Sequence, residues 1–120
     1  MSKDPKILLL HILESIETLQ KYLTGVDEAA YLANMEKQDS AERRLQVIGE
    51  AIVQLPGDFK ERYSRVPWAK IAGLRNRLVH EYFDIDHKLV WNLLDKSLPE
   101  FKEEIRRLLV EADNSTRPGS

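Results

Sequence analysis

The stretch DPKILLLHILESIETLQKYL, residues 4–23, decides the fold class of this 120-residue chain. Asp4 is a good N-cap, and Pro5 suits the first position of a helix. Apolar residues then recur at steps of three and four, at Leu9, Ile12, Leu13, Ile16, Leu19 and Leu23. This spacing predicts one long amphipathic helix that buries a single stripe and is stopped by Gly25.

A second stripe predicts another long helix, from about Asp39 or Ser40 to Leu55, which Pro56 and Gly57 terminate. Its apolar positions are Ala41, Leu45, Ile48, Ile52 and Leu55. The remaining chain predicts shorter helices, at about 27–35, 67–84, 86–96 and 99–112, with a helical turn near 59–63. We expect a break at 97–99, because proline disfavours helix at the residue before it.

No segment alternates polar and apolar residues with a period of two, so the sequence predicts an all-α fold. Two long amphipathic helices with shorter ones indicate an antiparallel bundle of about five to six helices. We expect residues 1–113 to form one domain and residues 114–120 a polar, disordered tail.

Apolar residues extend beyond the main stripes at Leu8, Leu10 and Val47. This excess indicates a second buried face, as in a homodimer, or equally a wide stripe within a single bundle.

Composition excludes several classes of protein. The chain contains no cysteine, so it has no disulfide framework and no thiolate metal site. No apolar run approaches the roughly 20 residues that span a membrane, and no secretory signal is visible. We therefore expect a cytoplasmic protein without membrane contact.

The net charge is -2, but residues 60–80 hold six Lys or Arg and one acid. Such a basic zone can attract a polyanion, although charge alone favours an ordinary solvated loop.

Three histidines are present, and two are interpreted as structural. His11 lies in an apolar stretch, and His87 is expected to be an exposed residue at a helix start. No spacing indicates a metal site or a phosphate-binding loop, so we expect no metal and no cofactor.

The third histidine, His80, lies in the segment RNRLVHEY, residues 75–82. On a helix with about 100° per residue, Asn76 shares a face with His80, whereas Arg75 lies about 140° away. Tyr82 returns to the side of Arg75. Arg75 and His80 of one copy therefore do not easily contact the same small group. Two copies that meet across a two-fold axis can line one cleft with two arginines and two histidines.

Two histidines and two arginines suit RNA cleavage without a metal. The reaction needs a base for the 2'-hydroxyl proton and an acid for the leaving 5'-oxygen, and histidine titrates in the right range for both. Arg75 can bind the phosphate as its charge grows, and Asn76 can orient the imidazole or bind the phosphate. The alternative is that Arg77 and Glu81 form an ordinary surface pair and His80 caps the helix.

From about Ala41 to Leu109 the chain resembles the HepT-like toxins of the HEPN superfamily. The resemblance rests on the motif Arg-x4-His-x-Tyr, which Arg75, His80 and Tyr82 match. Flanking matches are Ile48-Gly49-Glu50-Ala51, Pro67-Trp68, Tyr82-Phe83, Trp91 and Leu98-Pro99.

The resemblance implies a homodimeric, all-α, metal-independent endoribonuclease toxin with Arg75, Asn76 and His80 as catalytic residues. It also implies a partner, a minimal nucleotidyltransferase antitoxin that transfers AMP to Tyr82. Supporting roles are expected for Arg77 and Glu50. Alternatively, Glu50 only forms a pair with Arg75. The competing hypothesis is a non-catalytic helical module that binds nucleotide or docks the nucleotidyltransferase.

Overall fold

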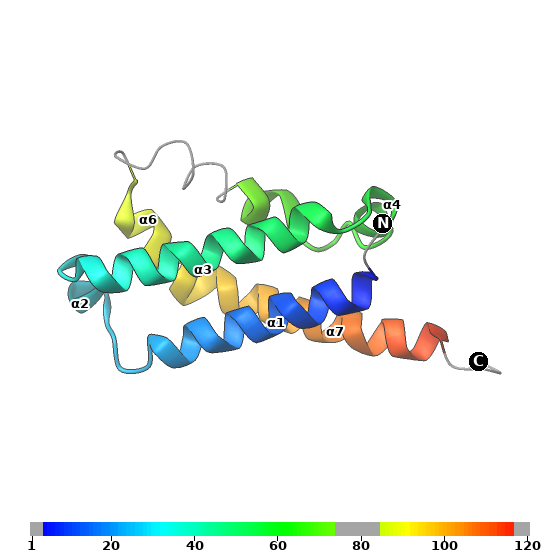
Figure 1. Cartoon of the computed structure of the whole chain (residues 1–120), viewed down its shortest axis with the longest axis horizontal. Coiled ribbons are helices and arrows are strands. Elements are labelled where there is room, and N and C mark those ends of the chain that lie inside the picture. The colour runs from blue at the N-terminus through cyan, green and yellow to red at the C-terminus, as the bar shows by residue number, and fades with distance from the viewer. Residues whose placement is uncertain (1–3, 74–84, 117–120) are drawn as a thin grey trace.

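Three long helices form the body of the protein in a computed structural model that describes residues 4–73 and 85–116. They are α1 (Pro5–Tyr22), α3 (Met35–Gln54) and α7 (Leu98–Thr116). Helix α1 packs against both α3 and α7 and runs antiparallel to them (Figure 1). None of the described residues forms a β-strand, which confirms the all-α prediction for this part of the chain.

The start of α1 follows the sequence signals. The Asp4 carboxylate accepts a hydrogen bond from the backbone N–H of Lys6 at 2.9 Å, and Pro5 occupies the first helical position. The helix ends at Tyr22, and Gly25 has a φ of 80°, which glycine adopts without the steric cost of a side chain. The predicted first helix is therefore confirmed.

Helix α3 begins at Met35, earlier than the predicted start at residue 39 or 40, which was wrong. The Asn34 side chain caps it by accepting a hydrogen bond from the N–H of Lys37 at 3.0 Å. One turn later, the buried Gln38 amide donates to the carbonyls of Tyr31 and Leu32, each at 3.1 Å. Gln38 thereby provides hydrogen-bond donors for the last carbonyls of the short helix α2 (Glu28–Leu32) and holds this helix against α3.

The predicted break at residues 97–99 is also wrong. Helix α6 (His87–Asn92) continues through a π-helical turn, η2 (Leu93–Ser97), directly into α7. The N–H of Leu98 bonds to the carbonyl of Leu93, five residues earlier. Pro99 has no N–H, and its ring would clash with the carbonyl four residues before it in a regular α-helix. The wider π turn gives room for this ring, so the helical path bends without ending.

Helix α7 also runs beyond the predicted end at Ala112, to Thr116. The helix therefore includes residues 114–116, and residues 117–120 lie outside the described part.

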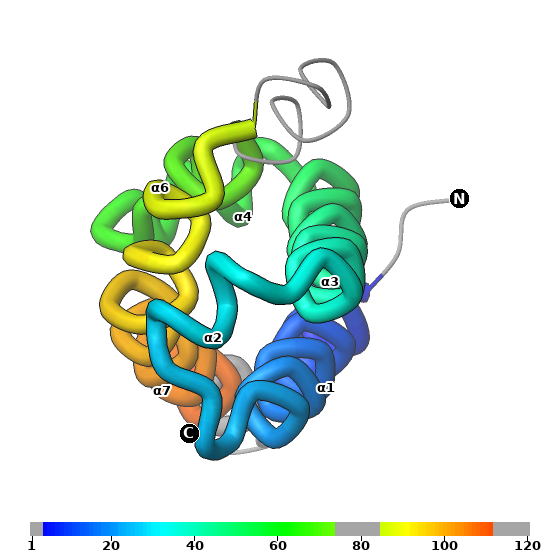
Figure 2. Tube along the Cα trace, turned by 90° about the vertical axis from the view of Figure 1, so that its left-hand side faces the viewer, coloured from blue at the N-terminus to red at the C-terminus, as the bar shows by residue number. Residues whose placement is uncertain are grey.

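The helices surround one apolar core, as the view along the bundle shows (Figure 2). Its fully buried side chains include Ile12, Ile16, Leu45, Ile48, Ile52, Phe101 and Ile105. Leu8 is also buried, so this part of the apolar excess belongs to a wide stripe within one chain. Leu10 and Val47 remain exposed at 47% and 39%. None of the helices in the described ranges is both long and apolar enough to cross a membrane.

Two isoleucines on α1 provide a matched test of this core. Ile12 is fully buried, whereas Ile7 is 52% exposed. We predict that Ile12→Ala lowers the free energy of unfolding by about 2–5 kcal/mol, because it removes buried methyl groups and leaves a cavity. Ile7→Ala should change it by less than about 0.5 kcal/mol. Urea denaturation measures both, and equal losses would contradict the arrangement of α1.

Candidate nucleic-acid site

The motif residues Arg75, Asn76, Arg77, His80 and Tyr82 lie outside the described residues, within the segment 74–84. Their arc on the helix and the offset between Arg75 and His80 therefore stay predictions. The structure describes the two places where the chain enters and leaves this segment, at Gly73 and at Ile85.

The entry to the motif is held by an aromatic cluster. Residues 68–73 are helical, and Trp68 and Ile71 on this helix are buried. The Trp68 indole meets the Phe101 ring of α7 edge-on, with centroids 6.0 Å apart, and its N–H donates to the carbonyl of Tyr63 at 3.2 Å. Phe59, on helix α4 (Gly57–Arg62), packs against Tyr63 and Trp68. This cluster fixes the helix that leads into Arg75.

The exit from the motif is held by a polar pair. Asp86 caps α6 by accepting hydrogen bonds from the N–H groups of Lys88 and Leu89 at 3.0 and 3.2 Å. The next residue, His87, places Nδ1 2.7 Å from Oε1 of Glu42 on α3. His87 is the first residue of α6, which confirms its predicted place at a helix start. The prediction that it is exposed is wrong, because its side chain is only 35% exposed and contacts a buried carboxylate.

Glu42 was not singled out from the sequence, since its partner lies 45 residues away. Burial raises the pKa of the Glu42 carboxyl, and nearby Asp39 adds to the rise. The His87 imidazole opposes this by charge and by its hydrogen bond, but burial dominates. Burial also raises the pKa of the Tyr31 hydroxyl, with Glu42 and Asp39 contributing. That hydroxyl is fully buried and has no hydrogen-bond partner among the described residues.

Glu50 lies on α3 eight residues after Glu42 and is partly buried. Its predicted pairing with Arg75 involves a residue outside the described ranges. The described residues contain no group of three or more His, Cys, Asp or Glu side chains suited to hold a metal ion.

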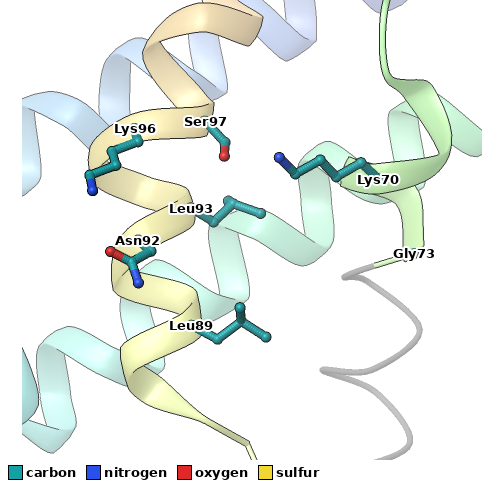
Figure 3. Close-up of a pocket in the computed structure, with 7 residues that line it drawn as sticks. All are labelled: Lys70, Gly73, Leu89, Asn92, Leu93, Lys96 and Ser97. Atoms are coloured by element: carbon teal, nitrogen blue, oxygen red, sulfur yellow. The ribbon is translucent and has the colours of Figure 1, made fainter.

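A pocket of about 470 Å³ lies beside the entry to the motif, between the helical residues 68–73 and the path from α6 into η2 (Figure 3). Gly73, the last described residue before the motif, lines it together with Lys70, Leu89 and Leu93. Sequence reasoning missed this pocket. The basic zone drew attention to Lys70, but no local pattern shows that α6 returns to face it.

The described residues form a helical bundle on both sides of a segment whose sequence is basic and contains a histidine. Comparison with known proteins then identifies the family: residues 12–108 match the model described as Ribonuclease HepT-like. The match covers most of the chain, which therefore belongs to this family.

Named relatives agree with this assignment. The chain is 35% identical over 107 residues to a protein named "Putative RNase" from Caldanaerobacter subterraneus subsp. tengcongensis, covering 89% of this chain and 96% of that protein. It is 30% identical to the "Probable ribonuclease HepT" of Thermococcus cleftensis, covering 90% and 98%.

A third relative, from Methanocaldococcus jannaschii, is named "Gamma-glutamylcyclotransferase and putative RNase" and is 41% identical over 115 residues. The match covers 96% of this chain but about half, 52%, of that relative. No solved structure matches the chain.

The raised pKa of Glu42 predicts how stability depends on pH. The Glu42 carboxyl binds its proton more tightly in the folded protein than in the unfolded chain. The contribution of Glu42 is therefore complete below the ordinary glutamate pKa and is lost as the pH rises through the raised value. Because Glu42→Gln cannot ionise, we predict that its stability relative to wild type increases as the pH rises above the ordinary glutamate pKa.

Melting temperatures at stepped pH measure this difference, with Glu61→Gln at an exposed position of α4 as the control. A difference between Glu42→Gln and wild type that stays constant across the range would contradict the prediction.

Proposed function

We propose that this protein is an endoribonuclease that cuts RNA in a cleft between two copies of the chain. The main support is that this chain belongs to the Ribonuclease HepT-like family and contains Arg75, Asn76, His80 and Tyr82 in the order of the motif. The fixed entry through Trp68 and the fixed exit through His87 support this proposal. The described residues on either side of the motif segment pack on one bundle, and such support limits the positions that reacting groups adopt.

In the proposed reaction, one His80 imidazole accepts the 2'-hydroxyl proton while the 2'-oxygen attacks the phosphorus. The His80 of the second copy protonates the departing 5'-oxygen. Arg75 holds the phosphate oxygens as negative charge builds, and Asn76 orients an imidazole or contributes a further hydrogen bond. The products carry a 2',3'-cyclic phosphate and a 5'-hydroxyl. No step requires a metal ion.

We further propose that the protein is the toxin of a toxin–antitoxin pair in the cytoplasm. Its partner is a minimal nucleotidyltransferase that modifies Tyr82. The phenolic oxygen of Tyr82 bonds to the α-phosphorus of ATP, the bond to the β-phosphate bridge breaks, and pyrophosphate leaves while the phenolic proton passes to solvent. The attached nucleotide then adds bulk and negative charge beside Arg75, and this excludes RNA by volume and repulsion.

The enzyme hypothesis predicts a large effect at His80. His80→Ala should slow RNA cleavage by at least about 100-fold, because it removes both the acid and the base. His11→Ala, at an exposed position of α1, should leave the rate unchanged. Cleavage of a labelled RNA in EDTA, with analysis of the product ends, measures both effects. Equal cleavage by His80→Ala would favour a non-catalytic binding module, and loss of cleavage in EDTA would contradict the metal-free mechanism.

The modification of Tyr82 is tested by mass spectrometry after co-expression with a minimal nucleotidyltransferase. We expect the peptide containing Tyr82 to gain the mass of AMP and the purified protein to lose RNA cleavage. In Tyr82→Phe the ring is retained but the nucleophile is absent, so neither change should occur. An unmodified Tyr82 in a neutralised complex would show that inhibition works by binding.

A further inference from the structure

The pocket beside Gly73 combines a basic wall with an apolar floor. Lys70 extends across it from the helical residues 68–73 toward Ser97 and Leu93, while Leu89 faces the same space from α6 (Figure 3). Lys96 and Asn92 complete its lining on the α6–η2 side. Lys70 is the lysine that points into the pocket, whereas the side chains of Lys96 and Asn92 are directed away from Lys70 (Figure 3), and no carboxylate lines the pocket among the described residues.

Charge separates this pocket from its neighbours. The adjoining pocket shares Lys70 and Ser97, but Glu100, Glu103 and Glu104 also line it. Arg65 at that pocket is already bound, at 3.3 Å to Glu104 and 2.7 Å to Glu111. The other described pockets contain Asp95, or Asp39 with Glu42. A polyanion meets repelling carboxylates in each of these, so the pocket beside Gly73 is the most favourable of them for phosphate.

Its shape and surface suit one nucleotide. A volume of about 470 Å³ lies in the range of small-ligand pockets. Leu89 is 43% exposed and offers apolar surface on the wall opposite Lys70 (Figure 3). An unstacked base covers such a surface with its flat face. The Ser97 hydroxyl, which points toward Lys70 (Figure 3), offers a donor and an acceptor to the base edge.

The position of the pocket relates it to the motif. Gly73 lines the pocket and precedes Arg75 by two residues, a separation that spans at most about 7 Å of chain. This separation is short enough for a nucleotide next to a phosphate held at Arg75 to reach the pocket.

From these observations we infer that the pocket is an RNA subsite next to the cutting site. Lys70 binds a backbone phosphate there, and Leu89 and Leu93 contact the base of the adjoining unpaired nucleotide. This inference rests on the proposed ribonuclease function and names the part of the substrate that the described residues recognise.

The test measures binding of a fluorescent single-stranded RNA to the non-cleaving His80→Ala protein over a series of salt concentrations. Adding Lys70→Ala should weaken binding and reduce the slope of log affinity against log salt by about 0.7, the value for one lost phosphate contact on a single strand. Lys70→Arg keeps the charge and should keep the slope. Lys21→Ala, on α1 away from the pocket lining, removes the same charge and should leave affinity and slope unchanged.

The apolar floor gives an independent signal. Leu89→Ala should weaken binding without changing the salt slope, because no phosphate contact is lost. Equal affinity and slope in Lys70→Ala and its parent would overturn the inference. So would a change in the sedimentation of Leu89→Ala from dimer to monomer, since the pocket would then be covered by a second copy of the chain.

The two proposals fail in different ways. If wild type cleaves RNA and Lys70→Ala binds normally, the subsite is wrong and the ribonuclease function stands. If His80→Ala still cleaves but Lys70→Ala loses affinity and slope, the catalytic assignment is wrong and the subsite stands. Absence of RNA binding by the His80→Ala protein overturns the subsite directly.

Discussion

The edge-on contact of Trp68 with Phe101 and the pairing of His87 with Glu42 determine where the chain enters and leaves the segment 74–84. One contact ties the entry helix to α7, and the other ties the start of α6 to α3. Both partner helices belong to one core, so the described residues on either side of the segment are tied to the same bundle. The proposed chemistry depends on this constraint, because general acid–base catalysis requires groups that keep a fixed separation.

The two anchors differ in physical character. The entry contact buries aromatic surface, which is favourable at any pH. The exit contact places the Glu42 carboxyl where burial raises its pKa, with His87 only partly compensating. A buried polar pair is a weak source of stability, but it is specific about geometry. We interpret it as a contact that selects the register of α6 on α3, and thereby the point at which the motif segment ends.

Local signals predicted much of the fold. The cap at Asp4 and the apolar stripe of α1 follow from neighbouring residues. The errors involve interactions that sequence spacing does not show. Helix α3 starts earlier than predicted because Asn34 caps it and Gln38 binds the last carbonyls of α2. Pro99 does not end a helix because a π turn accommodates its ring. The Glu42–His87 pair and the pocket around Lys70 join residues far apart in the chain. The motif itself was found by its order of residues, and its geometry stays a prediction.

Mixing wild type with an inactive variant tests the central claim, that cleavage requires a His80 from each of two copies. Wild-type and His80→Ala proteins are purified separately and then mixed in a series of ratios under conditions that exchange subunits, and RNA cleavage is measured in each mixture. A mixed dimer keeps only one His80, so it lacks either the acid or the base. The account predicts that cleavage falls with the square of the wild-type fraction, because only dimers of two wild-type chains cut RNA. Cleavage that falls only in proportion to the wild-type fraction, while native mass spectrometry shows the mixed dimer, would contradict it.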